Sequence, residues 1–242
     1  AGEKIESAKV VFYVDAIGGC CNESFQVAVK MHKSANAPSL AGHSNSHLKS
    51  LFTTEGTSKS LTYEPPVDTV VHATRDSPDL KEMVQEIVDM SGWASGNAMA
   101  VLFGDATGTL EGHSREYESV DSSPTMAPSL MVTFCPAKAT VSCSDGSTAV
   151  TVSMMISNSG DDVEESVENT SYPLYETSSD LELGYDKDKY TGNQYVGLRF
   201  PGMSVPAGAK IESAKVVFYV DAIGGCCNER FQVALKMHKS AN

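Results

Sequence analysis

The chain has 242 residues, 41% of them hydrophobic, which is enough apolar material for one large β domain or two smaller domains. Its formal net charge of −13 argues against a nucleic-acid partner, because surfaces that bind phosphate backbones need clustered Lys and Arg. No run of 18 or more apolar residues is present, so the sequence predicts no membrane span.

A block of 36 residues occurs twice, at residues 1–36 and again at 207–242, which is 206 residues further on. The two copies differ at three positions only, namely Glu3 against Ala209, Ser24 against Arg230 and Val29 against Leu235. A near-identical return at a fixed spacing is the signature of a tandem array. We therefore expect one repeat of 206 residues plus an overlap, with neighbouring copies of itself as partners.

The first strands are expected inside this repeat block. Residues 4–16 are apolar on both faces and predict an interior strand, and residues 25–31 alternate as a second strand. Residues 33–60, rich in Ser, Asn, His, Gly and Thr, predict a long surface loop. A metal site at His43 and His47 would need a helix to bring both rings to one face, and this composition disfavours a helix.

One short helix is expected at about 77–90. Residues 76–79 supply a cap, a proline for the first turn and an acidic residue for the helix dipole, and an apolar stripe follows at Leu80, Val84, Ile87 and Val88. Strands are expected before it at 69–73 and after it at 98–103. Trp93, beside the helix end, is expected to pack in the core or at its rim.

Further along, we expect a polar loop over residues 104–123, a closing strand over 127–134 and another strand over 150–156. The predicted parts of the chain are residues 1–134, the C-terminal part of one repeat, residues 135–149, the connector between repeats, and residues 150–242, the N-terminal part of the next repeat.

Six cysteines stand at Cys20, Cys21, Cys135, Cys143, Cys226 and Cys227. Each repeat thus carries an even number without zinc-type spacing, which favours disulfides and an extracellular or cell-surface location. A bridge between Cys135 and Cys143 would stiffen the connector, whereas pairing either of them with Cys20 or Cys21 would join the connector to the sheet. The sequence leaves both pairings open.

An acidic segment follows the strand at 150–156, with carboxylates at Asp161, Asp162, Glu164, Glu165 and Glu168. Oxygen ligands at this density suit calcium, which takes six to eight of them. The alternative is a hydrated loop, because acidic runs are usually solvated. Calcium is the one cofactor that the sequence suggests.

Five of the nine tyrosines lie close together, at Tyr172, Tyr175, Tyr185, Tyr190 and Tyr195. Interleaved with Asp, Asn and Thr, they fit carbohydrate binding, in which a ring stacks on the apolar face of a sugar while polar groups bind its hydroxyls. The alternative is that tyrosine simply favours half-buried strands.

A family resemblance rests on the order of several motifs. Residues 178–184 (SSDLELG), 195–200 (YVGLRF) and 205–218 resemble the opening half of DNRLRE-type domains, which are jelly-roll-like sandwiches related to alginate-type carbohydrate-binding modules. Residues 84–88 (VQEIV), 92–98 (GWASGNA) and 127–130 (APSL) are similar to the closing half. The resemblance implies a non-catalytic β-sandwich of the kind found in secreted polysaccharide-active enzymes and repetitive surface proteins, without a defined ligand site.

The fold class is therefore predicted as all-β: a jelly-roll-like antiparallel β-sandwich with one short helix, repeated in tandem. Half a sandwich exposes sheet edges, so the part from 150 to 242 needs the part from 37 to 134. Closure within one chain would make residues 1–36 and 207–242 compete for one position. We favour pairing with neighbours along a filament, because a repeat plus an overlap is what a window in a long polymer contains.

The predicted function is a non-catalytic, extracellular structural or adhesive repeat of a fibre, coat or surface protein, with polysaccharide as a second partner. Glycosylation sequons at Asn22 and Asn169 fit secretion. The alternative is a carbohydrate-binding module of a polysaccharide-active protein. We do not expect an enzyme, since motifs of hydrolases, zinc proteases and nucleotide enzymes are missing from the sequence.

Overall fold

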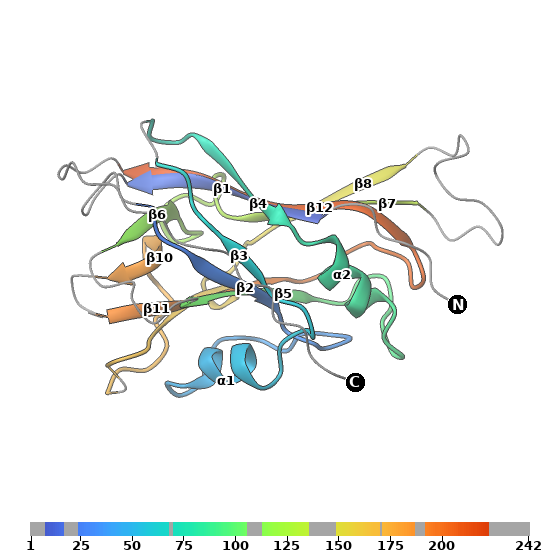
Figure 1. Ribbon diagram of the computed structural model, residues 1–242, viewed down its shortest axis with the longest axis horizontal. Coiled ribbons are helices and arrows are strands. Elements are labelled where there is room, and N and C mark those ends of the chain that lie inside the picture. The colour runs from blue at the N-terminus through green and yellow to red at the C-terminus, as the bar shows by residue number, and fades with distance from the viewer. Residues whose placement is uncertain are drawn as a thin grey trace.

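The computed structural model describes residues 8–16, 24–67, 70–105, 113–135, 149–169, 171–186 and 192–222. In this part the chain is mostly β, with two short helices and two antiparallel sheets that face each other, one of them curled into a half-barrel (Figure 1). The prediction of a β-sandwich-like fold is confirmed.

The first layer contains β4 (Thr74–Asp79) and β7 (Ser129–Cys135), and both β1 (Ala8–Ala16) and β12 (Lys210–Ala222) are paired to the same residues of these two strands. A further strand, β8 (Val150–Met155), lies alongside β7, and the hydroxyl oxygens of Thr133 and Thr151 are 2.9 Å apart. Val152 and Met154 on one face of β8 are partly buried against the main core, whereas the alternate residues are exposed, as expected for a strand at the edge of a sandwich.

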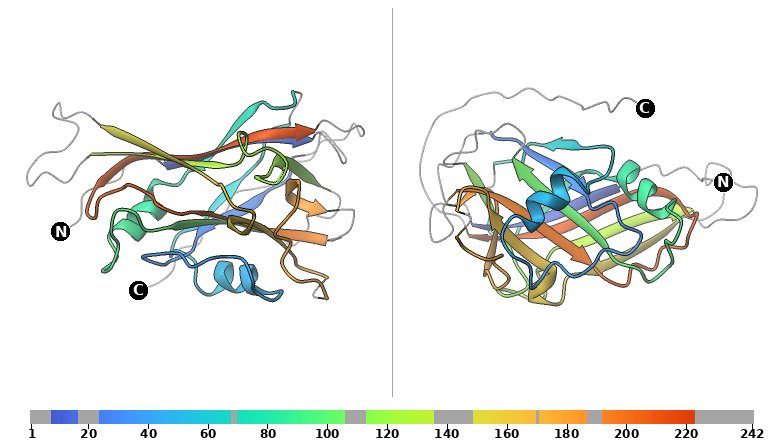
Figure 2. Two further views of the ribbon diagram at one scale, coloured as in Figure 1. Left: turned by 180° about the vertical axis from the view of Figure 1, so that it is seen from behind. Right: turned by 90° about the horizontal axis from the view of Figure 1, so that it is seen from below.

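The second layer runs in the order β3 (Leu61–Tyr63), β2 (Val27–Met31), β5 (Met99–Asp105), β11 (Gly192–Phe200) and β9 (Asp162–Ser166). Two more strands, β10 (Asp180–Asp186) and β6 (Ser114–Glu118), join the layers at one end. Strand β10 pairs with β11 and β6, and β6 pairs with β1 and β12 (Figure 2). This connection curls the sheet.

The core lies between the layers, and a second apolar layer covers the outside of β5 and β11. Met99, Val101 and Phe103 belong to the main core, whereas Leu102, the alternate residue of the same strand, belongs to the outer cluster. Because both faces of β5 are covered, its sequence is apolar throughout rather than alternating. Trp93 is buried in the main core and donates its indole N–H to the Val205 carbonyl at 3.2 Å, which confirms its predicted packing.

The predicted helix is present as α2 (Lys81–Val88), and its apolar face, including Val84, Ile87 and Val88, is buried. It begins later than predicted, because Thr74–Asp79 form β4 and pair with β1 and β12. The predicted cap at residues 76–77 is therefore wrong. Asp79 still acts at the helix start, where its Oδ1 accepts the Lys81 N–H at 3.0 Å.

A second helix, α1 (His47–Thr53), lies where a surface loop was predicted. The helix lies on the outer side of the second layer (Figure 1), and its residues Leu48, Leu51 and Phe52 are buried in the outer cluster. The free N–H groups of its first turn are satisfied by Glu165, whose carboxylate accepts from Leu48 at 2.6 Å. Within the described part of the chain, no helix is long and apolar enough to cross a membrane.

The predicted polar loop over residues 104–123 is also corrected, because it contains strand β6. Arg115 on this strand is buried, donates its Nε–H to the Pro66 carbonyl at 3.0 Å and lies over the Phe25 ring. The strand predicted at 69–73 lies instead at Thr74–Asp79. The strands predicted at 25–31, 98–103, 127–134 and 150–156 are confirmed as β2, β5, β7 and β8.

Gly104 is required where the Tyr195 ring crosses β5. A Cβ atom at this position would lie 2.4 Å from Tyr195 Cε1, and the ring cannot retreat because it packs against Phe52. We expect Gly104→Ala to lower the free energy of unfolding by about 1–3 kcal/mol, as overpacking does. Urea denaturation checks the value, and a double-mutant cycle with Tyr195→Ala is the control. If the two losses simply add, the ring is not the obstacle.

Candidate functional site

Strand β12 fills a position between β7 on one side and β4 and β6 on the other. The register pairs that define it are Val216 with Leu130, Val217 with Ser129, Phe218 with Arg75, Tyr219 with Thr74 and Val220 with Tyr117. We call this place, bounded by Ser129–Val132 of β7, Thr74–Asp76 of β4 and Tyr117 of β6, the shared strand position.

Strand β1 is paired to the same residues. Its register pairs are Val10 with Leu130, Val11 with Ser129, Phe12 with Arg75, Tyr13 with Thr74 and Val14 with Tyr117. Every β1 residue in this list is the 206-residue image of the β12 residue with the same partner. The two copies of the repeat block therefore pair with the same residues at the shared strand position, in an identical register.

One position holds one strand at a time. Each edge of a strand presents a single row of N–H and C=O groups, and a ladder with one neighbour uses that row fully. The backbone of Ser129 cannot make full ladders with Val11 and Val217 through the same edge. Strands β1 and β12, which lie along each other in both figures and pair in parallel at Tyr13 and Tyr219, are alternative occupants.

The occupant completes the core. On β12, Ile211, Ala214, Val216 and Phe218 have no exposed surface, and the Phe218 ring contacts Phe103 of the opposite layer. An unoccupied position would leave both layers without these side chains. Burial of each large apolar side chain contributes roughly 1.5–3 kcal/mol, so the fold depends on having an occupant.

The two parts of the chain close onto each other within one molecule. Strands β10, β11 and β12, from residues 180–222, pair with strands from residues 27–135. The sequence predicted that closure within one chain would make the two copies compete for one position, and the registers have this property. Pairing between neighbouring chains stays a proposal.

Most of the acidic segment is buried: Asp162–Ser166 form strand β9 and Asp161 lies in the short turn before it, whereas Glu168 follows the strand and is exposed. The carboxylates have different partners. Asp161 pairs with Arg199 at 2.7 Å, Asp162 accepts the Val120 N–H at 2.8 Å, Glu164 accepts the Glu182 N–H at 2.7 Å, Glu165 caps α1, and Glu168 accepts the Asn193 N–H at 2.6 Å. Among the described residues no group of three or more His, Cys, Asp or Glu side chains is arranged to hold a metal ion. The calcium role stays a prediction without support from this geometry.

Glu164, which is buried, and Glu182, which is partly buried, form a carboxyl pair that the sequence did not single out. Burial raises the pKa of Glu164 to about 8, and burial together with the adjacent Glu164 carboxylate raises the pKa of Glu182 well above its usual value. The two side chains share a hydrogen bond, so the pair keeps a proton at neutral pH. Burial also raises the pKa of Asp162 to about 7.

Only a long-range contact could have revealed this pair. In the stretch 180–183 acidic and apolar residues alternate, which by itself predicts that Glu182 faces water. It is instead partly buried, because Glu164 of β9, 18 positions earlier, lies against it and accepts its backbone N–H. This pair gives β9 and β10 a contact whose stability depends on pH.

The four tyrosines of this group that the structure describes lie in different surroundings. Tyr195 is buried in the cluster under α1, Tyr175 forms a backbone bridge with Glu164, Tyr185 lies on β10, and Tyr172 is exposed at 39%. Tyr190 lies outside the described residues. Burial of Tyr195 fits the alternative explanation by strand propensity, and carbohydrate binding through the others stays a prediction.

Several predicted sites fall outside the described residues, namely Cys20, Cys21, Cys143, Cys226, Cys227 and Asn22. Cys135 is described at the end of β7, with its sulfur 2.8 Å from Glu212 Oε1. Since it is the one cysteine described, no disulfide between two described cysteines can be tested, and pairing stays a prediction. Asn169 is partly exposed, as a glycosylation acceptor must be.

His43 and His47 lie closer than a loop prediction suggests. Their rings stack with centroids 3.7 Å apart, and His47 begins α1. The burial of His47, with His43 beside it, lowers its pKa. The sequence predicted a loop without a helix here, and the helix that begins at His47 corrects that prediction.

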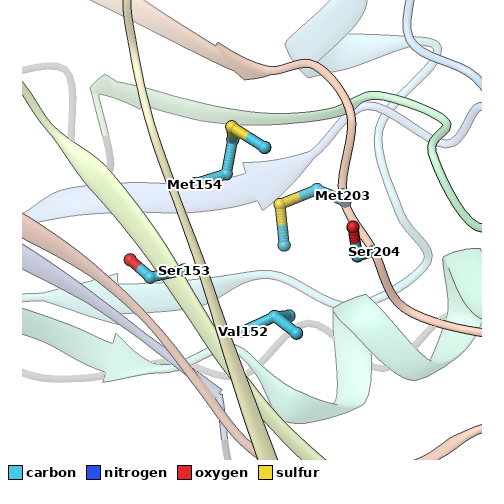
Figure 3. A pocket seen from close by; sticks show the side chains of 5 residues that line it. All are labelled: Val152, Ser153, Met154, Met203 and Ser204. Atoms are coloured by element: carbon cyan, nitrogen blue, oxygen red, sulfur yellow. The ribbon is translucent and has the colours of Figure 1, made fainter.

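A pocket of about 280 Å³ opens between β8 and the segment after β11. Figure 3 shows its five lining side chains: Val152, Ser153 and Met154 from β8, and Met203 and Ser204 from that segment. The lining contains two hydroxyls and no ionisable group. This arrangement supplies apolar contact but no acid, base or nucleophile activated by one.

Comparisons with family models, with curated proteins and with solved structures found no match to this chain, so the resemblance to DNRLRE-type domains stays a prediction.

Proposed function

We propose that this chain is a non-catalytic structural repeat of an extracellular fibre, coat or surface protein, in which each 206-residue unit forms one jelly-roll-like sandwich. The observation that carries the proposal is the identical register of β1 and β12 at the shared strand position. An identical register is what the same strand of two successive units would have, which supports the proposal.

The number of copies of the repeat block, compared with the number of shared strand positions, supports a tandem array. In a continuous array each unit brings one copy of the block and one shared strand position, so every strand has a place. The present chain has two copies and one position. Neither the array nor its extracellular setting needs any reaction chemistry, and the carboxyl pair is engaged in contacts within the fold.

A structural repeat should bear force as discrete units. We expect a chain of several 206-residue repeats, stretched between its ends with cysteines reduced, to unfold in equal steps. Each step should release about 700 Å of contour, from roughly 3.4 Å per extended residue. Single-molecule force measurement reads the steps directly. Steps that are unequal, or extension without any cooperative step, would count against one sandwich per repeat.

A further inference from the structure

Of the two copies of the repeat block, one is left over when the other occupies the shared strand position. A copy displaced from the shared strand position would carry KVVFYV, apolar on both faces, and would need ladder partners for its N–H and C=O groups. Such a strand is prone to pair with any complementary sheet edge. We propose that it enters the shared strand position of a second copy of this chain. This inference deepens the proposed function and rests on it for its biological setting.

The position cannot distinguish its own strand from a foreign one. Residues 4–16 and 210–222 are identical, since the three differences between the copies fall outside these ranges. Any copy therefore presents the side chains that fill the core at Val216 and Phe218, and the same row of backbone groups. A strand from another molecule has equal complementarity to β7, β4 and β6.

What separates the two cases is concentration. A chain's own strands are tethered to its shared strand position, and a flexible tether gives them an effective concentration in the millimolar range at that position. A second molecule therefore competes when chains fold together at high concentration, or when they are held side by side as in an array. Exchange between folded molecules is expected to be slow, because the occupant must first leave the core.

A cross-link tests this exchange in folded protein. One chain carries Ser129→Cys and another carries Val217→Cys; these register partners are both only partly buried, so neither change opens the core. Directly opposed residues of antiparallel strands lie within reach of a disulfide. The two chains are refolded together at high concentration and oxidised, and peptide mapping identifies the linked residues among the native cysteines.

We expect a 129–217 link that joins two different chains, in at least a tenth of the molecules, and an equivalent link when Val11→Cys replaces Val217→Cys. The matched control, Thr62→Cys on β3, is also partly buried but pairs with Ala28, so it should not link to position 129. Melting curves show that each variant is folded.

Two results overturn the proposal. One is a 129–217 link that forms when both substitutions are in one chain but never between chains. The other is the lack of any such link in folded protein. The proposed function is tested separately. Unequal force steps together with an interchain link would reject the tandem array but would still support strand exchange.

Discussion

A chain that carries both Val10→Asp and Val216→Asp should fail to fold, whereas each single variant should remain folded. Both residues have Leu130 of β7 as register partner, and one intact copy is enough to fill the shared strand position. A single substitution should therefore lower the free energy of unfolding by about 1 kcal/mol or less. With both copies changed, an unpaired carboxylate must be buried against Leu130, which costs several kcal/mol, comparable to the whole stability of a domain.

Urea denaturation followed by circular dichroism measures the three variants. The matched control is Val196→Asp on β11, because Val196 is equally buried, pairs with Phe103 and has no second copy. That single change should be as damaging as the double change. If Val216→Asp alone unfolds the chain, β1 cannot replace β12, and the two strands are not interchangeable.

The buried carboxyls should make the protein more stable at pH 6.5 than at pH 9. The pKa of Glu164 rises to about 8 and that of Asp162 to about 7 in the fold, because burial penalises their charged forms. In the unfolded chain these groups release their protons near pH 4. The folded state thus holds more protons across this window, and its stability falls as the pH rises through the folded pKa values.

The expected difference is about 2 kcal/mol between pH 6.5 and pH 9, or roughly 5 °C in melting temperature for a chain of this size. The comparison stops at pH 6.5 because burial lowers the pKa of His32, which gives the opposite dependence at lower pH. Scanning calorimetry at several pH values provides the measurement. A melting temperature that is flat or rises toward pH 9 would show that these carboxyls are solvated.

The Glu182→Gln variant distinguishes the contribution of the Glu164–Glu182 pair to the pH dependence of stability from the contribution of net charge. Glutamine keeps a donor for Glu164 but removes one of the two acids, so the variant should gain stability at pH 9 and lose at least half of the pH dependence. Glu64→Gln, an exposed site, changes the net charge equally and should leave the dependence unchanged. Equal behaviour of the two variants would assign the effect to overall charge.

Local patterns were sufficient for the elements that pack by their own periodicity. The stripe at Val84, Ile87 and Val88 predicts α2 because a helix repeats every 3.6 residues whatever it packs against. The apolar run that became β5 predicts a covered strand for the same reason. Trp93 follows from its place beside a helix end that has to dock.

Partners from far along the chain decided the elements that were missed. Helix α1 is short and polar by composition, and it forms because Gly197 leaves room for Leu48 while Glu165 caps its first turn. Composition favours a hydrated loop for the acidic segment, but β11 pairs with it, and its carboxylates accept N–H groups or bind an arginine from β10, β11, α1 and the residues after β6. Neither contact has a signal within the segment itself.

The repeat block shows which features the sequence determines and which depend on the tertiary structure. The sequence by itself determined that residues 1–36 and 207–242 are two copies of one strand-forming block, since identity at a fixed spacing needs no structure to be seen. Only the tertiary structure decided that both copies have the same partners at Leu130, Arg75 and Tyr117. The physical reason is that register depends on which edges flank a strand, and those edges come from β4, β6 and β7, outside the block.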